Sequence, residues 1–215
     1  MSISFDTSDA IRQAGVGATA TFDLAAAEAN EIAVIFVWSN AIPSAVTVEG
    51  VGATAVGSIS FAGGAQFIHC YYFLNPPTSV TTSYAATSTN PELHVLLYKG
   101  AKQTDQPDSF NSLDDTNPNP FTISTTVVAS DCWLVSMARD YAAGAVSAGT
   151  GTTLREAGVG ASSGDSGAVV GTGAQSMGWV PNSAGNDTAG FIVSISPAAV
   201  AVVSSLTDDF MLLRN

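Results

Sequence analysis

The chain has 215 residues, of which 46% are hydrophobic and only 11% are charged, and its formal net charge at pH 7 is −12. Six basic residues against 18 acidic ones leave no cationic patch, which excludes nucleic acid and anionic membrane surfaces as partners. This length and hydrophobic content suffice for one sizeable core, and we expect a single domain over residues 1–215.

The first fifteen residues, MSISFDTSDAIRQAG, contain neither the cationic segment nor the apolar stretch of a secretory signal. Along the rest of the chain, no apolar run reaches the roughly 18 residues that a membrane-spanning helix needs. We therefore expect a soluble protein that is made in the cytoplasm of its host. Residues 1–15 are expected to form a short N-terminal arm.

Runs of β-branched and aromatic residues, separated by Gly, Pro, Asn and Ser, predict β-strands along most of the chain. Helical patterns are nearly absent, and only residues 22–31 (FDLAAAEANE) could hold a short helix. Short, evenly spaced strands are typical of a sandwich rather than of alternating strands and helices. The sequence thus predicts an all-β fold, an antiparallel and jelly-roll-like β-sandwich. The expected strands are 2–5, 18–24, 31–39, 44–50, 54–61, 66–74, 79–86, 92–100, 121–128, 132–141, 174–180 and 189–198.

Two of these strands, at residues 32–38 (IAVIFVW) and 67–74 (FIHCYYFL), are apolar on both faces. Such strands belong at the centre of a sheet, covered on both sides. The words GVGATA, at Gly15 and again at Gly50, are not accompanied by a repeated strand pattern, so they are weak evidence of an internal repeat.

Two long polar stretches separate the expected strands. Residues 100–121 contain three prolines and four aspartates, and we expect a long loop without a strand of its own. Its carboxylates are of the kind that binds Ca²⁺, but they match no defined calcium loop, so a solvated acidic loop is the preferred interpretation. Residues 148–175 form a tract of Gly, Ser, Thr and Ala that offers few anchors.

The pair His69-Cys70 and the later segment Gly164–Gly167 (GDSG) follow the order seen in trypsin-like serine proteases. An aspartate of the 105–115 stretch would complete the triad with His69 and Ser166. Strand alternation, however, places His69 in mid-strand beside Phe67 and Tyr71, which favours a packed histidine. The GDSG word also lacks the Gly-Pro that follows it in those proteases. We therefore expect no catalytic residue, and the protease remains a remote alternative in which Ser166 would react with a fluorophosphonate.

The remaining chemistry-bearing residues are few. Cys70 and Cys132 lie in apolar runs and are interpreted as buried free thiols, although a single bridge between strands stays open. His94 is expected in the core or an interface, and the sequence contains no metal-ligand spacing and no cofactor motif. Trp38 and Trp133 are expected in the core. Trp179 is placed near a strand end as the best candidate for an exposed aromatic and a partner contact.

Four segments together resemble the jelly-roll-like β-sandwiches of accessory structural proteins of tailed phages. The first three are EIAVIFVWSNAIPSAVTVEGVGATAV, FIHCYYFLNPPTSVTTSYAATS and LLYKGAKQTDQPDSF, and AGFIVSISPA closes the match, which covers residues 31–198. The resemblance carries no catalytic residue. It implies a virion protein without enzymatic activity, either a capsid decoration (cement) protein or an accessory protein of the tail or its fibres. The implied partners are other copies of the chain, with homotrimers as one form, and other virion proteins.

The segment 198–215 is expected to form a C-terminal arm. It ends in Phe210, Met211, Leu212 and Leu213, an apolar group that should dock on the chain's own sheet or on a neighbouring subunit. These four residues are, with Trp179, the candidate partner contacts. The alternative from another class is a carbohydrate-binding, lectin-like module for host adhesion, with glycans as partners, and it predicts Trp179 on an exposed rim.

Overall fold

The computed structural model describes residues 3–116, 118–142, 144–183 and 186–199. These residues form antiparallel sheets, and the all-β, jelly-roll-like fold expected from the sequence is confirmed. No α-helix occurs in the described ranges: residues 22–23 end β2, and residues 24–31 follow it as irregular backbone, bends and turns. The elements are β1 (Ser4–Arg12), β2 (Ala18–Asp23), β3 (Ile32–Ser39), β4 (Ala45–Val48), β5 (Val51–Gly52), β6 (Thr54–Phe61), the 3₁₀ turn η1 (Ala62–Gly64), β7 (Gln66–Leu74), β8 (Ser83–Ser88), β9 (Glu92–Lys99), β10 (Ser109–Thr116), β11 (Phe121–Val127), β12 (Trp133–Asp140), β13 (Ser147–Ala148), β14 (Thr153–Ala157), β15 (Ser162–Asp165), β16 (Gly173–Val180) and β17 (Asp187–Ile195).

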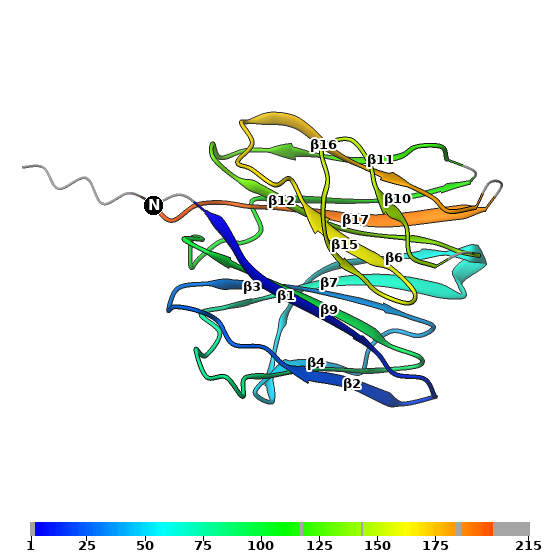
Figure 1. The fold of residues 1–215 in the computed structure, drawn as a ribbon, viewed down its shortest axis with the longest axis horizontal. Helices are drawn as coiled ribbons and strands as arrows, with labels where there is room; N and C mark the ends of the chain where they lie inside the picture. The colour runs from blue at the N-terminus through cyan, green and yellow to red at the C-terminus, as the bar shows by residue number, and fades with distance from the viewer. Residues whose placement is uncertain (1–2, 117, 143, 184–185, 200–215) are drawn as a thin grey trace, which may run out of the picture.

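The strands form four sheets that are stacked as layers (Figure 1). Outer sheet 1 has the order β2-β8-β4-β5, and inner sheet 1 has the order β1-β9-β3-β7-β6. Inner sheet 2 follows, with the order β10-β17-β12-β15-β14, and outer sheet 2, with the order β11-β16-β13, completes the stack. The first two sheets come from the N-terminal half of the chain and the last two from the C-terminal half.

The two halves repeat one strand connectivity. We count eight strands in each half, with β5 and β6 taken as one strand that crosses between sheets. In the inner sheets the order is then first, eighth, third and sixth, which is β1-β9-β3-β7 in one half and β10-β17-β12-β15 in the other. The second, seventh and fourth strands form the outer sheet, which is the jelly-roll order. The repeat lies in the connectivity of the strands. The GVGATA words do not mark it, because one runs into β2, the second strand, and the other runs through β5 into β6, the fifth strand.

Three hydrophobic clusters fill the spaces between the four layers. In β3, Val34 and Phe36 point into the cluster between the two inner sheets, whereas Ile35 and Val37 point toward outer sheet 1. The third cluster lies between inner sheet 2 and outer sheet 2 and includes Trp179. Strands of the inner sheets are thus covered on both faces, which explains the doubly apolar runs in the sequence.

Two segments that the sequence presents as an arm and a loop are edge strands of the inner sheets. The N-terminal arm, residues 1–15, contributes β1, which pairs with β9 of its own chain. The acidic stretch 100–121 contains β10, which pairs with β17 from Ser109↔Ser194 to Thr116↔Asp187, so the expected strandless loop is wrong. An edge strand needs only one backbone partner, and most side chains of β10 are exposed, so apolar alternation is weak there.

Candidate functional site

A buried polar cluster joins the two inner sheets, and we call it the Glu92 cluster. Nε2 of His94 lies 3.0 Å from Glu92 Oε1, and Nδ1 of His94 lies 2.9 Å from the Ser163 hydroxyl. The Glu92 carboxylate also accepts the backbone N–H groups of Gly160 at 2.6 Å and Ala161 at 3.0 Å. Glu92, His94 and Ser163 are completely buried. The cluster ties β9 of the N-terminal half to β15 and the loop before it in the C-terminal half.

Glycines make this close approach possible. A Cβ on Gly160 would stand 2.6 Å from Glu92 Oε2, and a Cβ on Gly158 would collide with the same carboxylate. The Gly-rich composition of residues 158–164 therefore has a structural reason, because backbone donors must reach a buried carboxylate without side chains in the way.

Arg139 extends the Glu92 cluster toward the edge of the inner sheets. Its Nε donates to Gln66 Oε1 at 2.7 Å, and its Nη1 donates to the carbonyl of Gly160. The guanidinium lies 3.8 Å over the Trp38 ring, and the indole N–H of Trp38 donates to the same Gln66 oxygen at 3.1 Å. Burial lowers the pKa of Arg139 to about 10 against the opposing effect of the Glu92 carboxylate, so Arg139 is charged at neutral pH.

A second buried cluster, the Asp165 cluster, also joins the two halves. The Asp165 carboxylate accepts the Tyr98 hydroxyl at 3.0 Å and the Arg155 guanidinium at 2.7 and 3.1 Å. It also accepts the backbone N–H of Gly167 at 2.8 Å. Burial, together with the adjacent Asp165 carboxylate, raises the pKa of Tyr98 well above its usual value. The Arg155 guanidinium lies 3.9 Å over the ring of Phe5 in β1.

The structure does not assemble the residues of the trypsin-like pattern. Ser166 lies in the turn after β15, where its hydroxyl donates to the Ala168 carbonyl at 2.6 Å and accepts the Leu134 N–H at 3.2 Å. The neighbouring Asp165 is bound in its own cluster. His69 lies on the opposite face of inner sheet 1, beside Tyr71, which packs against the core under outer sheet 1.

The Glu92–His94–Ser163 arrangement has the order of a hydrolytic triad, but its geometry serves the fold. A triad serine must reach a substrate carbonyl, and Ser163 is completely buried between two sheets. Both oxygens of Glu92 are held by backbone donors, so the cluster is an internal tie. His94 lies in the core, as its sequence context predicts. The burial of Glu92, Asp165 and Arg139 was not predicted, because only the pairing of the two halves creates it.

His69 is packed, as expected from its mid-strand position. Its ring stacks on Phe67 at a centroid distance of 5.7 Å and lies 6.5 Å from that of Tyr71. The side chain is 4% exposed, and Nε2 has no hydrogen-bond partner among the described residues. Burial lowers the pKa of His69 from 6.5 to about 4.

Acidification should therefore destabilise the protein through His69. Because the folded state holds the imidazole neutral, the unfolded state binds more protons as the pH falls from 6.5 toward 4, and stability falls with it. We expect this residue to account for about 2 kcal/mol of unfolding free energy lost between about pH 7 and pH 5. Urea unfolding of His69→Leu should show that much less pH dependence than the original chain. Identical pH profiles would contradict the assignment.

The expectation that Trp179 is an exposed partner contact is wrong. Trp179 is completely buried, and its indole N–H donates to the Ser136 hydroxyl at 3.1 Å. β16 pairs with both β11 and β13, so a position near the strand end still lies inside the layer between inner sheet 2 and outer sheet 2. Trp38 and Trp133 are buried as expected. The other candidate contacts, Phe210, Met211, Leu212 and Leu213, lie outside the described residues.

The cysteines and the acidic stretch carry no assembled site. Cys70 and Cys132 are free, buried thiols in different hydrophobic clusters. The Asp108 carboxylate accepts the backbone N–H groups of Val128 at 2.7 Å and Ala129 at 3.1 Å, so it fixes a turn. Within the described ranges, no three His, Cys, Asp or Glu side chains are grouped closely enough to hold a metal ion.

The fold is that of a tandem jelly-roll protein. The buried charged side chains of the Glu92 and Asp165 clusters bond one half to the other. No protein family, curated protein or solved structure was found to match the chain. In the part of the chain that the structure describes, no helix has the length and apolar character to cross a membrane.

Proposed function

We propose that the chain is a non-enzymatic structural protein of a virion that acts through contacts between subunits. Within that class, the resemblance to phage accessory proteins favours a capsid decoration protein or an accessory protein of the tail or fibre. The observation that carries the proposal is the composition of the two outer faces of the stack, on which short hydroxyl side chains predominate among the exposed strand residues.

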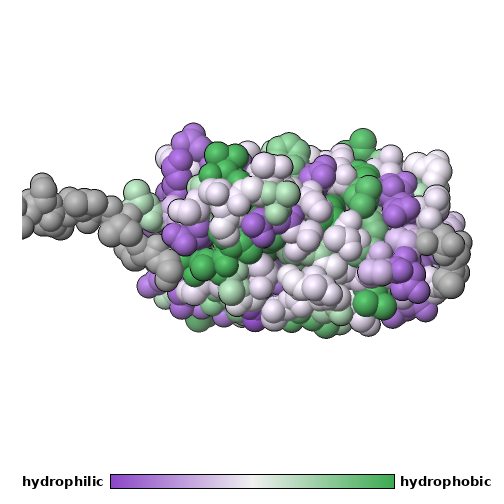
Figure 2. All heavy atoms as spheres, turned by 90° about the horizontal axis from the view of Figure 1, so that it is seen from above, coloured by the Kyte–Doolittle hydropathy of each residue, from purple (hydrophilic) through white to green (hydrophobic). Residues whose placement is uncertain are grey.

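Outer sheet 2 presents a row of small polar side chains to solvent. Thr122, Ser124 and Thr126 of β11 are exposed, and so are Ala174 and Ser176 of the adjacent β16. Seen from above the stack, pale side chains are mixed with hydrophobic and strongly hydrophilic ones (Figure 2).

Outer sheet 1 has the same character at the other end of the stack. Thr19 and Thr21 of β2 are exposed, and their hydroxyls lie 2.8 Å from that of Thr87 and 3.3 Å from that of Ser83. Charged groups resist burial because they must be desolvated, whereas short hydroxyl side chains leave a flat surface that a neighbour can cover. Two such faces on one molecule suit a protein that is packed among other subunits.

The C-terminal arm is the element proposed to hold subunits together, because β1 is already paired within its own chain. Removing residues 200–215 should convert an oligomer into a monomer, since the apolar group 210–213 is lost with them. The mass in solution, measured by light scattering for the full and truncated chains over a range of concentrations, tests this expectation.

A matched control keeps the length of the arm and changes only its apolar end. The double variant Phe210→Asp and Leu212→Asp should behave like the truncated chain, because charged side chains cannot be buried without a partner. A full chain that remains monomeric at all concentrations would contradict the self-assembly on which the proposed function depends.

A further inference from the structure

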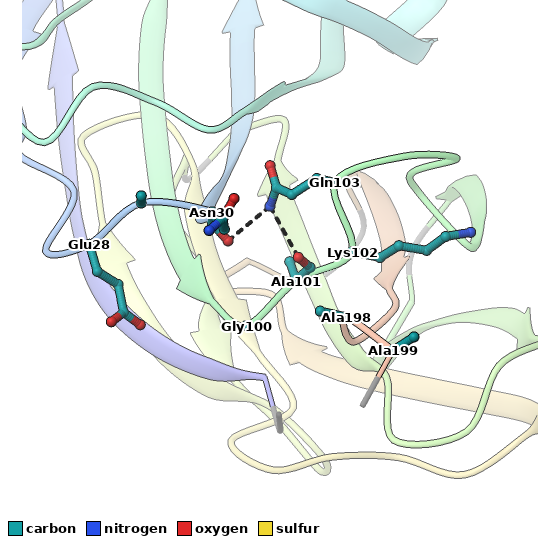
Figure 3. Close-up of a pocket in the computed structure, with 9 residues that line it drawn as sticks. Glu28, Asn30, Gly100, Ala101, Lys102, Gln103, Ala198 and Ala199 are labelled. Atoms are coloured by element: carbon teal, nitrogen blue, oxygen red, sulfur yellow. Dashed lines mark hydrogen bonds between the residues drawn. The ribbon is translucent and has the colours of Figure 1, made fainter. Parts of the chain in front are cut away.

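A cavity of about 440 Å³ opens where the described chain ends. It lies between the turn before β3 and the segment after β9, and its wall includes Ala29, Ala101, Ala198 and Ala199 (Figure 3). The volume falls in the range of pockets that bind small molecules and peptide side chains. The cavity is lined mainly by small apolar groups, so an apolar occupant fits it best.

The position of the cavity relates it to the C-terminal arm. The segment that leads to the arm is fixed to the wall, because Ala198 N–H donates to the Gly100 carbonyl at 2.8 Å. Sixteen residues follow Ala199, and their apolar end, 210–213, comes after ten intervening residues. Ten extended residues span roughly 33–36 Å, which is enough to reach an adjacent molecule.

The charges beside the cavity complement those beside the apolar end of the arm. Glu28 and Lys102 lie on opposite sides of the cavity (Figure 3). The Lys102 ammonium extends away from the cavity and pairs with the exposed Asp105 at 3.0 Å, so an arm aspartate would compete with Asp105 for it. In the arm, residues 208–209 are both aspartate, and Arg214 follows the apolar group. An arm laid across the cavity in one direction would therefore place its aspartates near Lys102 and Arg214 near Glu28.

Gln103 holds one side of the cavity wall in a defined position. The side-chain N–H₂ of Gln103 donates to the carbonyls of Asn30 at 2.8 Å and Ala101 at 3.0 Å (Figure 3). Its Oε1 atom is buried and has no partner among the described residues. The bonds from the N–H₂ group fix the Gln103 side chain, so this part of the cavity wall is held in place.

We propose that this cavity is the receptor for residues 210–213 of a second copy of the chain. The proposal rests on the proposed function and deepens it, since it names the surface that each arm binds. It follows that one chain offers both an arm and a receptor, so that copies join head to tail, and a closed ring results where the rotation permits.

A mixing experiment tests the proposal with two complementary chains. The first lacks residues 200–215 and keeps its cavity. The second is Ala29→Arg, which keeps the arm and blocks the cavity from an exposed position of its wall. Each alone should be monomeric by light scattering, and an equimolar mixture should form a complex of one copy of each. The control is Ala142→Arg, which places the same side chain at an exposed alanine just after the C-terminal end of β12, outside the cavity wall. This variant should assemble like the original chain.

The other outcomes overturn the proposal in distinguishable ways. If Ala29→Arg assembles like the original chain while the truncated chain does not, the cavity is not the receptor, although the proposed function stands. If the full chain is monomeric and a labelled peptide of residues 200–215 binds the truncated chain but not its Ala29→Arg form, the arm occupies the cavity of its own chain, and the self-assembly of the proposed function fails together with the second-copy receptor. If the full chain is monomeric and that peptide does not bind, both proposals fail.

Discussion

Replacing Glu92 with alanine is expected to lower the free energy of unfolding by about 3–5 kcal/mol, the usual cost of removing one partner from a buried charged cluster. Glu92 accepts the N–H groups of Gly160 and Ala161 and lies 3.0 Å from His94 Nε2. Alanine would leave these groups buried without an acceptor, and it would also remove the carboxylate that does most to favour the charged form of Arg139. Urea denaturation monitored by tryptophan fluorescence measures the effect.

The matched control is Asp23→Ala, which removes an exposed carboxylate at the end of β2. A substitution at such a surface position should change stability by no more than about 0.5 kcal/mol. A loss at Glu92 as small as that of the control would mean that the carboxylate is dispensable and that apolar packing alone joins the inner sheets.

The Glu92 and Asp165 clusters have a common role in the pairing of the two halves. Each has donors and acceptors from both halves, as in the bond from Tyr98 in β9 to Asp165 in β15. Apolar faces such as those of β3 and β12 are non-directional and fit one another in more than one register. We expect the buried polar bonds to select one register, as polar groups do in some coiled coils.

Local patterns in the sequence were sufficient to predict the strands that carry the cores. β3, β7, β9 and β17 coincide with runs of β-branched and aromatic residues, because strands buried on both faces require such side chains. β10 and β14 were missed, since edge strands with mostly exposed side chains lack that composition. β13 and the fully buried β15 were missed as well, because they are short and their residues are small or polar.

The duplication and the buried clusters could not be predicted in the same way. The two halves share a connectivity rather than a sequence pattern, and equivalent strands carry different side chains. β9 has the buried polar pair Glu92 and His94 on its face toward inner sheet 2. The equivalent strand β17 is apolar on its face toward inner sheet 1. Whether Asp165 or Arg139 is buried depends on the approach of the other half. Trp179 was misplaced for a related reason, because local spacing does not reveal that outer sheet 2 covers it.

Within the GDSG segment, Asp165 rather than Ser166 should be the residue that matters, and this separates a structural role from a catalytic one. Asp165→Ala would leave the Tyr98 hydroxyl buried without a partner and would remove the counter-ion of Arg155, at a cost of about 3–4 kcal/mol of unfolding free energy. Ser166→Ala removes two hydrogen bonds at a partly exposed turn and should cost only about 1 kcal/mol.

Thermal and urea unfolding of the two variants, measured together, decide between these roles. Replacing a catalytic nucleophile with alanine often leaves the stability of the fold unchanged and abolishes only the reaction, so stability measurements alone do not identify a nucleophile. The original chain should therefore also be treated with a fluorophosphonate, and neither Ser166 nor Ser163 should be labelled, because one hydroxyl is bonded within its turn and the other is completely buried. Labelling of either serine would indicate that the chain is a hydrolase. If neither serine is labelled and Asp165→Ala is much more destabilising than Ser166→Ala, the GDSG segment serves as a contact between the two jelly rolls.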